Sequence, residues 1–206
     1  MPKSRPPPSG QIPLGGFDLG RPTDRLFFAV YPDQAAAARI VELAQALRTR
    51  HGLRGSPLRA DRVHVTLHHL GDHHGLPESL LAMAGEVAAR VAMQPFEVAF
   101  DCVASFAGHA RKRPCVLRGD AEANAPLFAL QHELGERLRA AGSGRYVERR
   151  FTPHITLLYD DRLLAPEAVP AISWRVREFA LVHSLLGKTE HRVLGRWWNG
   201  QRLDLP

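Results

Sequence analysis

The chain has 206 residues, 45% of them hydrophobic, which is enough to bury a core as one domain or as two small lobes. Its 27 lysine and arginine residues outnumber 21 acidic residues, for a formal net charge of +6, and they are dispersed, which favours a polyanionic or phosphorylated ligand. No apolar run reaches the length of a membrane span and the first residues lack the apolar stretch of a secretory signal, so we expect neither a membrane protein nor a secreted one.

The chain has two cysteines, Cys102 and Cys115, which are too few for a disulfide scaffold. We expect them to be buried free thiols, and the alternative is a pair that faces each other across a hairpin. Such cysteine usage is typical of a reducing compartment, so we expect a cytoplasmic protein.

Residues 1–24 are rich in proline and glycine and show no hydrophobic periodicity. A segment of this kind cannot bury enough apolar surface to fold, so we expect a disordered leader. Residues 25–206 are then expected to form a single domain. That body keeps most of the positive charge, because the three basic residues of the leader are offset by two acidic ones.

The rest of the chain predicts a mixture of strands and helices. A continuously apolar run at Arg25–Tyr31 indicates a buried strand, and Asp33 is placed to cap a helix that runs to about residue 50. Two further helices are predicted to start at Pro77 and at Asn124, each with an apolar stripe. The other predicted strands are Arg62–Leu70, Phe96–Phe106, Pro114–Arg118, Phe151–Tyr159, Trp174–Leu186 and His191–Trp198.

One four-residue phrase occurs twice, as His64-Val65-Thr66-Leu67 and as His154-Ile155-Thr156-Leu157. Alternate side chains of a strand point to opposite faces, so in each copy the histidine and the threonine share one face while the two apolar residues face a core. Each half of the chain holds a helix and several strands around one copy. This layout predicts an α+β, bilobal fold: two pseudo-twofold-related lobes of antiparallel strands, helices packed outside, and both phrases at a central cleft.

Two histidines that face one cleft suit acid–base catalysis, because a free imidazole titrates at about 6.5. One ring can accept a proton from the attacking nucleophile while the other gives one to the leaving group, and phosphodiester cleavage needs both roles. The threonine hydroxyls can donate hydrogen bonds to the phosphate, with no metal or cofactor required. We expect a bell-shaped pH profile between roughly pH 5 and 8. The alternative, partly buried histidines beside threonines chosen as β-formers, does not explain why the phrase is repeated.

Three segments carry a resemblance to a known family: Arg25–Val30 (RLFFAV), Val63–Gly71 (VHVTLHHLG) and Phe151–Leu157 (FTPHITL). On these segments the chain resembles the two-histidine (2H) phosphoesterase superfamily, and within it the bacterial RNA 2′,3′-cyclic phosphodiesterases, also called 2′-5′ RNA ligases (LigT-like). The resemblance implies a bilobal fold and metal-independent hydrolysis of RNA 2′,3′-cyclic phosphate ends to 2′-phosphates, with reversible 2′-5′ RNA ligation as a related activity.

The resemblance also implies roles for individual residues. His64 becomes the general acid and His154 the general base, and Thr66 and Thr156 complete the catalytic set. The sequence departs from the usual family pattern at a few positions. The family usually has an aromatic residue at the position of His69, and often a tryptophan near residue 118 or a basic residue near residue 159. These positions shape the surroundings of the nucleotide, so the departures bear on substrate preference rather than on chemistry.

Other polar residues are candidates for substrate binding. We expect His68 to line the cleft, because strict alternation puts it on the same strand face as the first motif histidine, and we expect Arg150 to reach a phosphate from the start of the second motif strand. The basic loop at residues 111–113 is either an RNA contact or only solvated. Five histidines within residues 64–74 invite a metal interpretation. Zinc requires three or four ligands that converge on one point. Histidines spread along a single strand and the turn after it do not converge in this way, so we expect no metal site.

The expected partner is RNA with a 2′,3′-cyclic phosphate end or a small cyclic nucleotide, with no membrane contact, and we expect a monomer. Two alternatives stay open. The first is a phosphodiesterase that acts on small nucleotide cyclic phosphates or on 2′-5′ oligonucleotides. The second is a non-catalytic module that binds RNA ends, although binding alone has no use for two proton-transfer groups.

Overall fold

A computed structural model of the protein describes residues 21–107 and 112–203. Within these residues it contains three α-helices and nine β-strands. The helices are α1 (Gln34–His51), α2 (Glu78–Ala88) and α3 (Ala125–Ala140). The strands are β1 (Asp24–Val30), β2 (Val65–His73), β3 (Phe96–Ser105), β4 (Arg113–Arg118), β5 (His154–Asp160), β6 (Glu167–Val176), β7 (Phe179–Leu185), β8 (Glu190–Trp198) and β9 (Gln201–Leu203). The predicted α+β class is confirmed.

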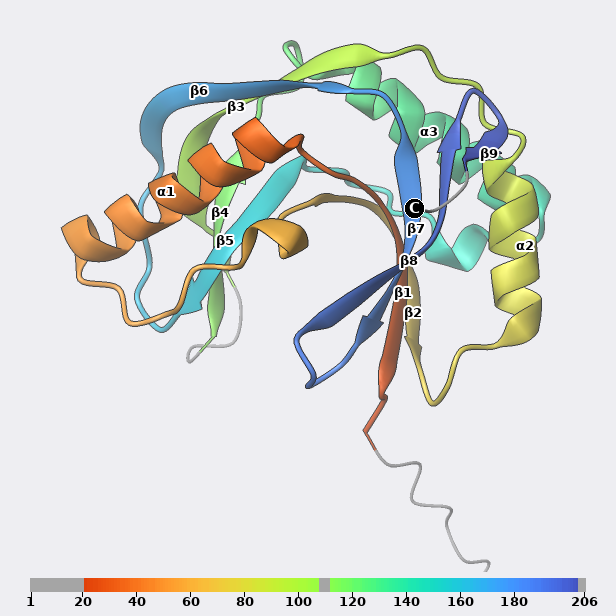
Figure 1. The fold of residues 1–206 in the computed structure, drawn as a ribbon, viewed down its shortest axis with the longest axis horizontal. Coiled ribbons are helices and arrows are strands. Elements are labelled where there is room, and N and C mark those ends of the chain that lie inside the picture. The colour runs from red at the N-terminus through yellow and green to blue at the C-terminus, as the bar shows by residue number, and fades with distance from the viewer. Residues whose placement is uncertain (1–20, 108–111, 204–206) are drawn as a thin grey trace, which may run out of the picture.

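All nine strands join one antiparallel sheet in the order β6-β3-β4-β5-β2-β1-β7-β8-β9. The sheet is nearly divided at its middle, because β2 and β5 share one paired position, Val65 opposite Ile155. Four strands lie on one side of this junction and five on the other, and Figure 1 shows the two groups as two lobes. The predicted bilobal arrangement, with the two motif strands at its centre, is confirmed.

The lobes do not follow the two halves of the chain, contrary to what we expected from the sequence. β1 and β2 join the C-terminal strands β7, β8 and β9, whereas the consecutive strands β3 to β6 form the other lobe. α1 follows β1 in the chain but packs across β5 and β6 of the opposite lobe. Elements that follow one another in the chain usually lie side by side in the fold, but this is only a tendency. Here the apolar run of β1 is buried between β2 and β7 of its own lobe.

One hydrophobic core lies between the sheet and all three helices. The apolar residues of the two repeated phrases belong to it and are at most 1% exposed: Val65, Leu67, Ile155 and Leu157. Burying a side chain of this size contributes about 1.5 to 3 kcal/mol, so these four residues hold each strand in one orientation. The predicted alternation is confirmed, and the histidine and threonine of each phrase point away from this core.

α1 begins and ends where its sequence predicts. The Asp33 carboxylate accepts a hydrogen bond of 2.8 Å from a backbone N–H of the first turn, and Gly52 ends the helix in the left-handed conformation, with φ of 60°. α3 also starts after Asn124 as predicted, but the Asn124 side chain does not cap it. That side chain is fully buried and exchanges hydrogen bonds of 3.1 and 2.8 Å with the backbone of Ala99, which ties the start of α3 to β3.

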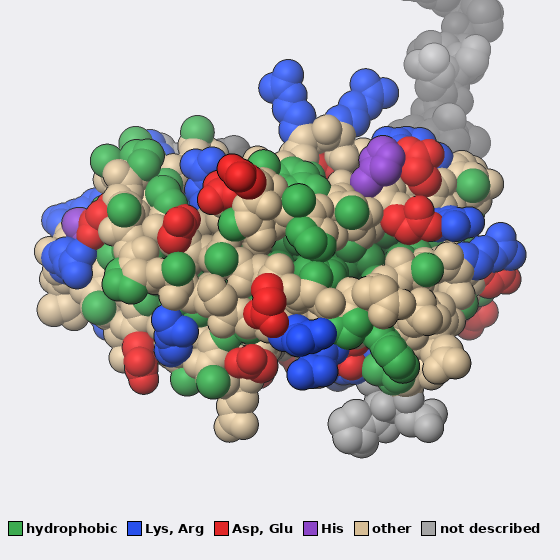
Figure 2. Space-filling view, turned by 90° about the horizontal axis from the view of Figure 1, so that it is seen from above, with side chains coloured by type: hydrophobic (Ala, Val, Ile, Leu, Met, Phe, Trp, Pro, Cys, Tyr) green, Lys and Arg blue, Asp and Glu red, His purple; other side chains and the backbone are tan. Residues whose placement is uncertain are grey.

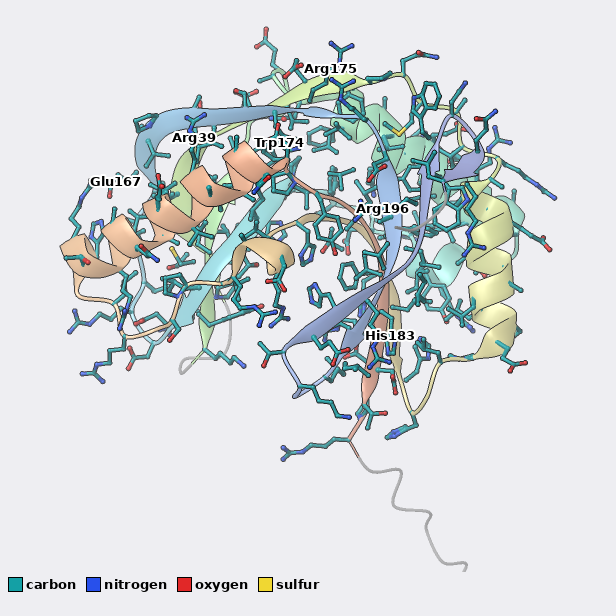
Figure 3. All side chains as sticks on the ribbon, viewed as in Figure 1. Arg39, Glu167, Trp174, Arg175, His183 and Arg196 are labelled. Atoms are coloured by element: carbon teal, nitrogen blue, oxygen red, sulfur yellow. The ribbon has the colours of Figure 1, made fainter. Side chains whose placement is uncertain are left out.

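The predicted strand Trp174–Leu186 is two strands, β6 and β7, separated by a short turn. β6 also begins earlier than predicted, at Glu167. Its first half carries Pro170 and no buried residue, which is typical of an edge strand, and β6 lies at the edge of the sheet. Figure 3 shows Arg39 of α1 beside this strand, where its guanidinium donates to the Ala171 carbonyl at 2.9 Å.

The folded part of the chain starts slightly before residue 25. Asp24 is the first residue of β1, is 8% exposed, and accepts a hydrogen bond of 2.6 Å from Nε2 of His183. His183 is labelled in Figure 3, at the same end of the sheet as the start of β1. Thr23 is bound to the sheet by two backbone hydrogen bonds. The predicted boundary at residue 24 is therefore too late, because these polar residues find buried partners; residues 1–20 lie outside the described residues.

The two cysteines lie on neighbouring strands without facing each other. Cys102 of β3 is in register with Arg118, and Cys115 of β4 is in register with Ser105, so the two are three positions apart along the ladder. Both are free thiols, as expected from the sequence; Cys115 is buried as expected, whereas Cys102 is only partly buried.

Basic and acidic side chains are interspersed on the surface. Figure 2 shows them as neighbours over the face that it presents, without a continuous basic area there. Several of them are paired, such as Arg25 with Asp72 and Arg59 with Asp61. Selective binding of an anion therefore calls for a concave site rather than a flat basic face. In the part of the chain that the structure describes, no helix is both long and apolar enough to span a bilayer.

Candidate active site

A cavity of about 940 Å³ lies at the junction of the two lobes. The histidine and threonine side chains of both repeated phrases line it: His64, Thr66, His154 and Thr156. His64 stands one residue before β2 and His154 is the first residue of β5, so both rings lie where their strands begin. The structure brings together the four residues that the sequence singles out.

The register of β2 and β5 decides how these side chains face one another. Val65 is opposite Ile155 in an antiparallel pair, and extending the pairing by one residue puts His64 beside Thr156 and Thr66 beside His154. Each histidine therefore has the other phrase's threonine as its cross-strand neighbour, and the two histidines lie on a diagonal. A phosphate at the centre would meet one imidazole and one hydroxyl from each lobe.

The two rings are held in the same way. Nδ1 of His64 donates to the carbonyl of Arg62 at 2.7 Å, and Nδ1 of His154 donates to the carbonyl of Thr152 at 2.8 Å. A carbonyl can only accept, so each Nδ1 carries a hydrogen and each neutral ring keeps its lone pair on Nε2. In both cases the carbonyl belongs to the residue two positions earlier, so the backbone just before each strand orients the ring.

Aromatic neighbours partly shield the two rings from water. His64 is stacked on Phe27 with 4.9 Å between ring centroids, and His154 meets the edge of Phe106 at 4.9 Å. Burial lowers the pKa of His64 to about 4, assisted by the positive charge of Arg62. Burial also lowers the pKa of His154, assisted by Arg118. At pH 7 both imidazoles of the ligand-free protein are therefore neutral.

A bulge in β2 decides which neighbouring histidine reaches the cavity. The pairing of β2 with β1 skips Leu67, so the alternation of faces shifts at that residue. His68 is turned into the core, 1% exposed, and its Nε2 donates to the Gln131 carbonyl at 2.8 Å. His69 lines the cavity instead. The expectation that His68 lines the cleft is wrong, because it assumed strict alternation through the bulge.

The expected basic contacts are only partly present in the cavity. Arg150 is exposed and does not line it, because β5 starts four residues later and the alternation of a strand does not extend back to residue 150. In the basic loop, Arg111 lies outside the described residues, but Lys112 does line the cavity. Its Nζ lies 5.3 Å from the ring centroid of Tyr159, another cavity residue.

The histidines beyond Gly71, His73 and His74, do not line the cavity. His73 donates from Nε2 to the Leu70 carbonyl at 2.9 Å. Across residues 21–107 and 112–203, no three His, Cys, Asp or Glu side chains are grouped as the ligands of a metal ion would be. The crowding of histidines along the sequence therefore does not become a cluster in space within these ranges.

Comparison with known proteins identifies the family of the chain. The model of the 2′-5′ RNA ligase superfamily matches residues 14–188. The RNA 2′,3′-cyclic phosphodiesterase of Escherichia coli (strain K12) is 34% identical over 184 residues, which cover 84% of this chain and 95% of that protein. The chain belongs to the 2′-5′ RNA ligase superfamily.

Solved structures agree with this membership of the 2′-5′ RNA ligase superfamily. A crystal structure of a Thermus thermophilus protein matches with a TM-score of 0.67 and 26% identity, covering 85% of this chain and 98% of its own. E. coli LigT complexed with NADP+ matches with a TM-score of 0.67 and 26% identity, covering 87% of this chain and 99% of its own. The resemblance that the sequence carries is confirmed at the level of family and fold.

Phe27, Arg62 and His191 are among the cavity residues of this superfamily member that were not identified as site residues from the sequence. The sequence contains a signal for Phe27. In a strand in the middle of a sheet, every second residue of an apolar run lies on the face of the sheet opposite the other residues of the run. Arg62 could have been noticed as the charged residue two positions before the first histidine. His191 carries no local signal, since it reaches the cavity only through the pairing of β8 with β7.

Proposed function

We propose that the protein is a phosphodiesterase that opens RNA 2′,3′-cyclic phosphate ends and leaves 2′-phosphates. The observation that carries this proposal is the cavity at the lobe junction, where two imidazoles with free Nε2 atoms and two threonine hydroxyls face one another. Membership of the 2′-5′ RNA ligase superfamily and the likeness to the E. coli RNA 2′,3′-cyclic phosphodiesterase support it. A module that only binds RNA ends would not need two such rings.

In this proposal His154 is the general base and His64 the general acid. Nε2 of His154 accepts a proton from the attacking water, the bond from phosphorus to the 3′ oxygen breaks, and Nε2 of His64 protonates that oxygen. The phosphate stays on the 2′ oxygen. The two rings are held alike, so this assignment follows the family resemblance. A 5′-hydroxyl that attacks in place of water would form a 2′-5′ phosphodiester by the same steps, which is ligation.

Thr66 and Thr156 bind the phosphate in this scheme. Negative charge accumulates on the non-bridging oxygens as the nucleophile adds, and hydroxyl donors held at those oxygens stabilise it. Because each threonine lies beside the opposite lobe's histidine, both sides of the phosphate have one donor and one proton-transfer group. Before chemistry one imidazole must also gain a proton, and the negative charge of the bound phosphate favours that protonation.

The size and walls of the cavity favour a nucleotide-bearing substrate over a bare phosphate. Ligand cavities measure about 300 to 1,000 Å³, and this one, at about 940 Å³, has room for a nucleoside beside the phosphate. Tyr159, 42% exposed, and His69 offer rings at its wall on which a base could stack. RNA ends are the proposed substrate, and a small cyclic nucleotide would use the same walls.

The purified protein is expected to convert an oligoribonucleotide that ends in a 2′,3′-cyclic phosphate into one that ends in a 2′-phosphate. The regiochemistry follows because the 3′ oxygen is the proposed leaving group. End-group analysis against synthetic 2′- and 3′-phosphate standards measures the product. A product with only 3′-phosphate would contradict the assignment of the leaving group, and the absence of any product would favour the module that binds RNA ends.

Turnover is expected to survive exhaustive chelation, because two imidazoles and two hydroxyls supply the proton transfer and charge stabilisation that a metal would otherwise provide. The measurement compares initial rates before and after dialysis against EDTA. A loss of turnover that added zinc reverses would contradict the two-histidine scheme. It would also assign a metal to residues that the scheme treats as proton carriers.

A further inference from the structure

The cations that line the cavity differ in how their charge is compensated. Arg25 forms a two-point ion pair with Asp72, with hydrogen bonds of 2.7 and 2.8 Å, so its charge is largely neutralised. Lys112 lies over an aromatic ring. Arg62 has no carboxylate within ion-pair distance in the described part of the chain, and its sequence neighbour Asp61 is bound to Arg59. Arg62 is therefore the cavity's arginine with uncompensated charge.

A neutral histidine holds the Arg62 side chain in place. Nη2 of Arg62 donates to Nε2 of His191 at 3.0 Å, so His191 acts as the acceptor and carries its own hydrogen on Nδ1. Burial, together with the nearby His64 and Arg62, lowers the pKa of His191 to about 4, so the ring adds no charge at pH 7. Arg62 Nε and His191 Nδ1 are both buried without a partner in the described part of the protein. The guanidinium of Arg62 is thus held in place by a neutral acceptor, and its positive charge stays available to a ligand.

The same arginine lies next to the first catalytic histidine. Its carbonyl accepts the hydrogen bond from Nδ1 of His64, and the rings of His191 and His64 meet edge to face with 5.3 Å between centroids. All three side chains line the cavity. An anion that is positioned for proton transfer by His64 would therefore lie beside an uncompensated guanidinium, which binds phosphate oxygens well.

We propose that Arg62 is a phosphate-binding residue of this cavity and that His191 is the positioning residue that holds its guanidinium. The inference deepens the proposed function, on which it rests, by assigning the His64 side of the scissile phosphate to this pair. Arg62 contacts the phosphate itself. His191 acts only through Arg62, as an uncharged acceptor that a carboxylate could not replace without neutralising the arginine.

The test measures the binding of adenosine 2′-phosphate, a product-like ligand, and of adenosine by calorimetry. Arg62→Met is expected to weaken adenosine 2′-phosphate binding about ten- to hundredfold and to leave adenosine binding within about twofold, because only the phosphate loses a charged hydrogen bond. Arg62→Lys should recover part of the loss. Arg192→Met is the matched control, since it removes an arginine charge one residue from His191 and outside the cavity, and it should change neither affinity more than about twofold.

His191 is tested with two substitutions of similar size. His191→Leu removes the acceptor and is expected to weaken adenosine 2′-phosphate binding about three- to tenfold, whereas His191→Gln, whose side-chain oxygen can accept from Arg62, should restore it to within about twofold. Thermal unfolding of each variant reports on folding. Equal losses in the leucine and glutamine variants would overturn the positioning role, because a purely structural defect would not distinguish an acceptor from an apolar group.

Other outcomes bear on Arg62 itself. If Arg62→Met leaves adenosine 2′-phosphate binding unchanged, or weakens adenosine equally, the assignment to phosphate is overturned. Failure of the wild type to bind adenosine 2′-phosphate would overturn it too. If the wild type binds adenosine 2′-phosphate through Arg62 but opens no cyclic phosphate, the binding inference stands and the proposed activity fails. Binding is measured without turnover, so the two failures are distinguishable.

Discussion

Replacing His64 or His154 by alanine is expected to lower kcat about a hundred- to ten-thousandfold. Each ring is proposed to supply one of the two proton transfers, and the other histidine that β2 brings to the cavity, His69, has its Nε2 bound to Asp72. The fold should be preserved, because each ring is only partly buried and the hydrogen bond that it loses is one to a backbone carbonyl. Steady-state kinetics on a cyclic-phosphate oligonucleotide, beside circular dichroism and thermal unfolding, measures both effects.

Graded variants sharpen this test. Thr66→Ala and Thr156→Ala are each expected to cost less than either histidine variant, since each removes one hydrogen bond to the phosphate. His132→Ala is the matched control, because this exposed histidine of α3 does not line the cavity, and it should keep kcat within about twofold. Near wild-type turnover in either motif histidine variant would show that the two-histidine mechanism is wrong for this chain.

The pH profile of kcat/KM is expected to have its maximum on the acidic side of pH 6.5. The reaction needs one protonated and one neutral imidazole, and at pH 7 both are neutral in the free protein because burial lowers the pKa of His64 to about 4 and also lowers the pKa of His154. As pH falls, the singly protonated pair grows and kcat/KM rises, about tenfold per unit on the alkaline limb. It falls again once both rings are protonated. The window of pH 5 to 8 expected from free imidazole is therefore shifted downward.

The substrate changes this profile in a defined direction. A bound phosphate places negative charge between the rings, which favours the protonated imidazole and raises its pKa. The profile of kcat, which reports on the bound complex, should therefore lie at higher pH than that of kcat/KM. Rates measured from pH 4 to 9 in buffers of constant ionic strength test this. A value of kcat/KM that climbs steadily from pH 6 to pH 9 would contradict it.

The limbs of the profile also separate the two roles. His154→Ala should lose the acidic limb, where the base would be protonated, and His64→Ala should lose the alkaline limb, where the acid would be deprotonated. If each variant loses the opposite limb, the roles are exchanged and the two-histidine mechanism stands.

Signals in the sequence were sufficient to predict the structure wherever interactions between neighbouring residues decide it. Asp33 and Gly52 mark the ends of α1 because capping involves only neighbouring residues. The alternation in the two phrases places Val65 and Ile155 in the core, and their histidines and threonines in the cavity, because strand geometry has a period of two. The family resemblance rests on these same residues.

Features decided by contacts between distant segments were not predictable in this way. The bulge at Leu67 arises from the pairing of β2 with β1, so strict alternation misplaced His68 and missed His69. His191 enters the cavity only because the sheet is completed by the C-terminal strands. Pro170 concealed the first half of β6, since proline within a strand is tolerated at an edge and the sequence does not tell which strand will be the edge.

The way in which the two motif histidine rings are held makes each phrase a self-contained module. A carbonyl two residues upstream orients each imidazole, so a stretch of about five residues carries its own aligned proton carrier. The rest of the molecule only has to hold the two modules at the right distance from each other. They are joined where β2 and β5 meet, at the one paired position of Val65 and Ile155. Insertions and substitutions in the outer strands of either lobe can therefore accumulate and reshape the walls for new substrates. The central pair lies next to both imidazoles, so a disturbance of that pair would change the distance between them.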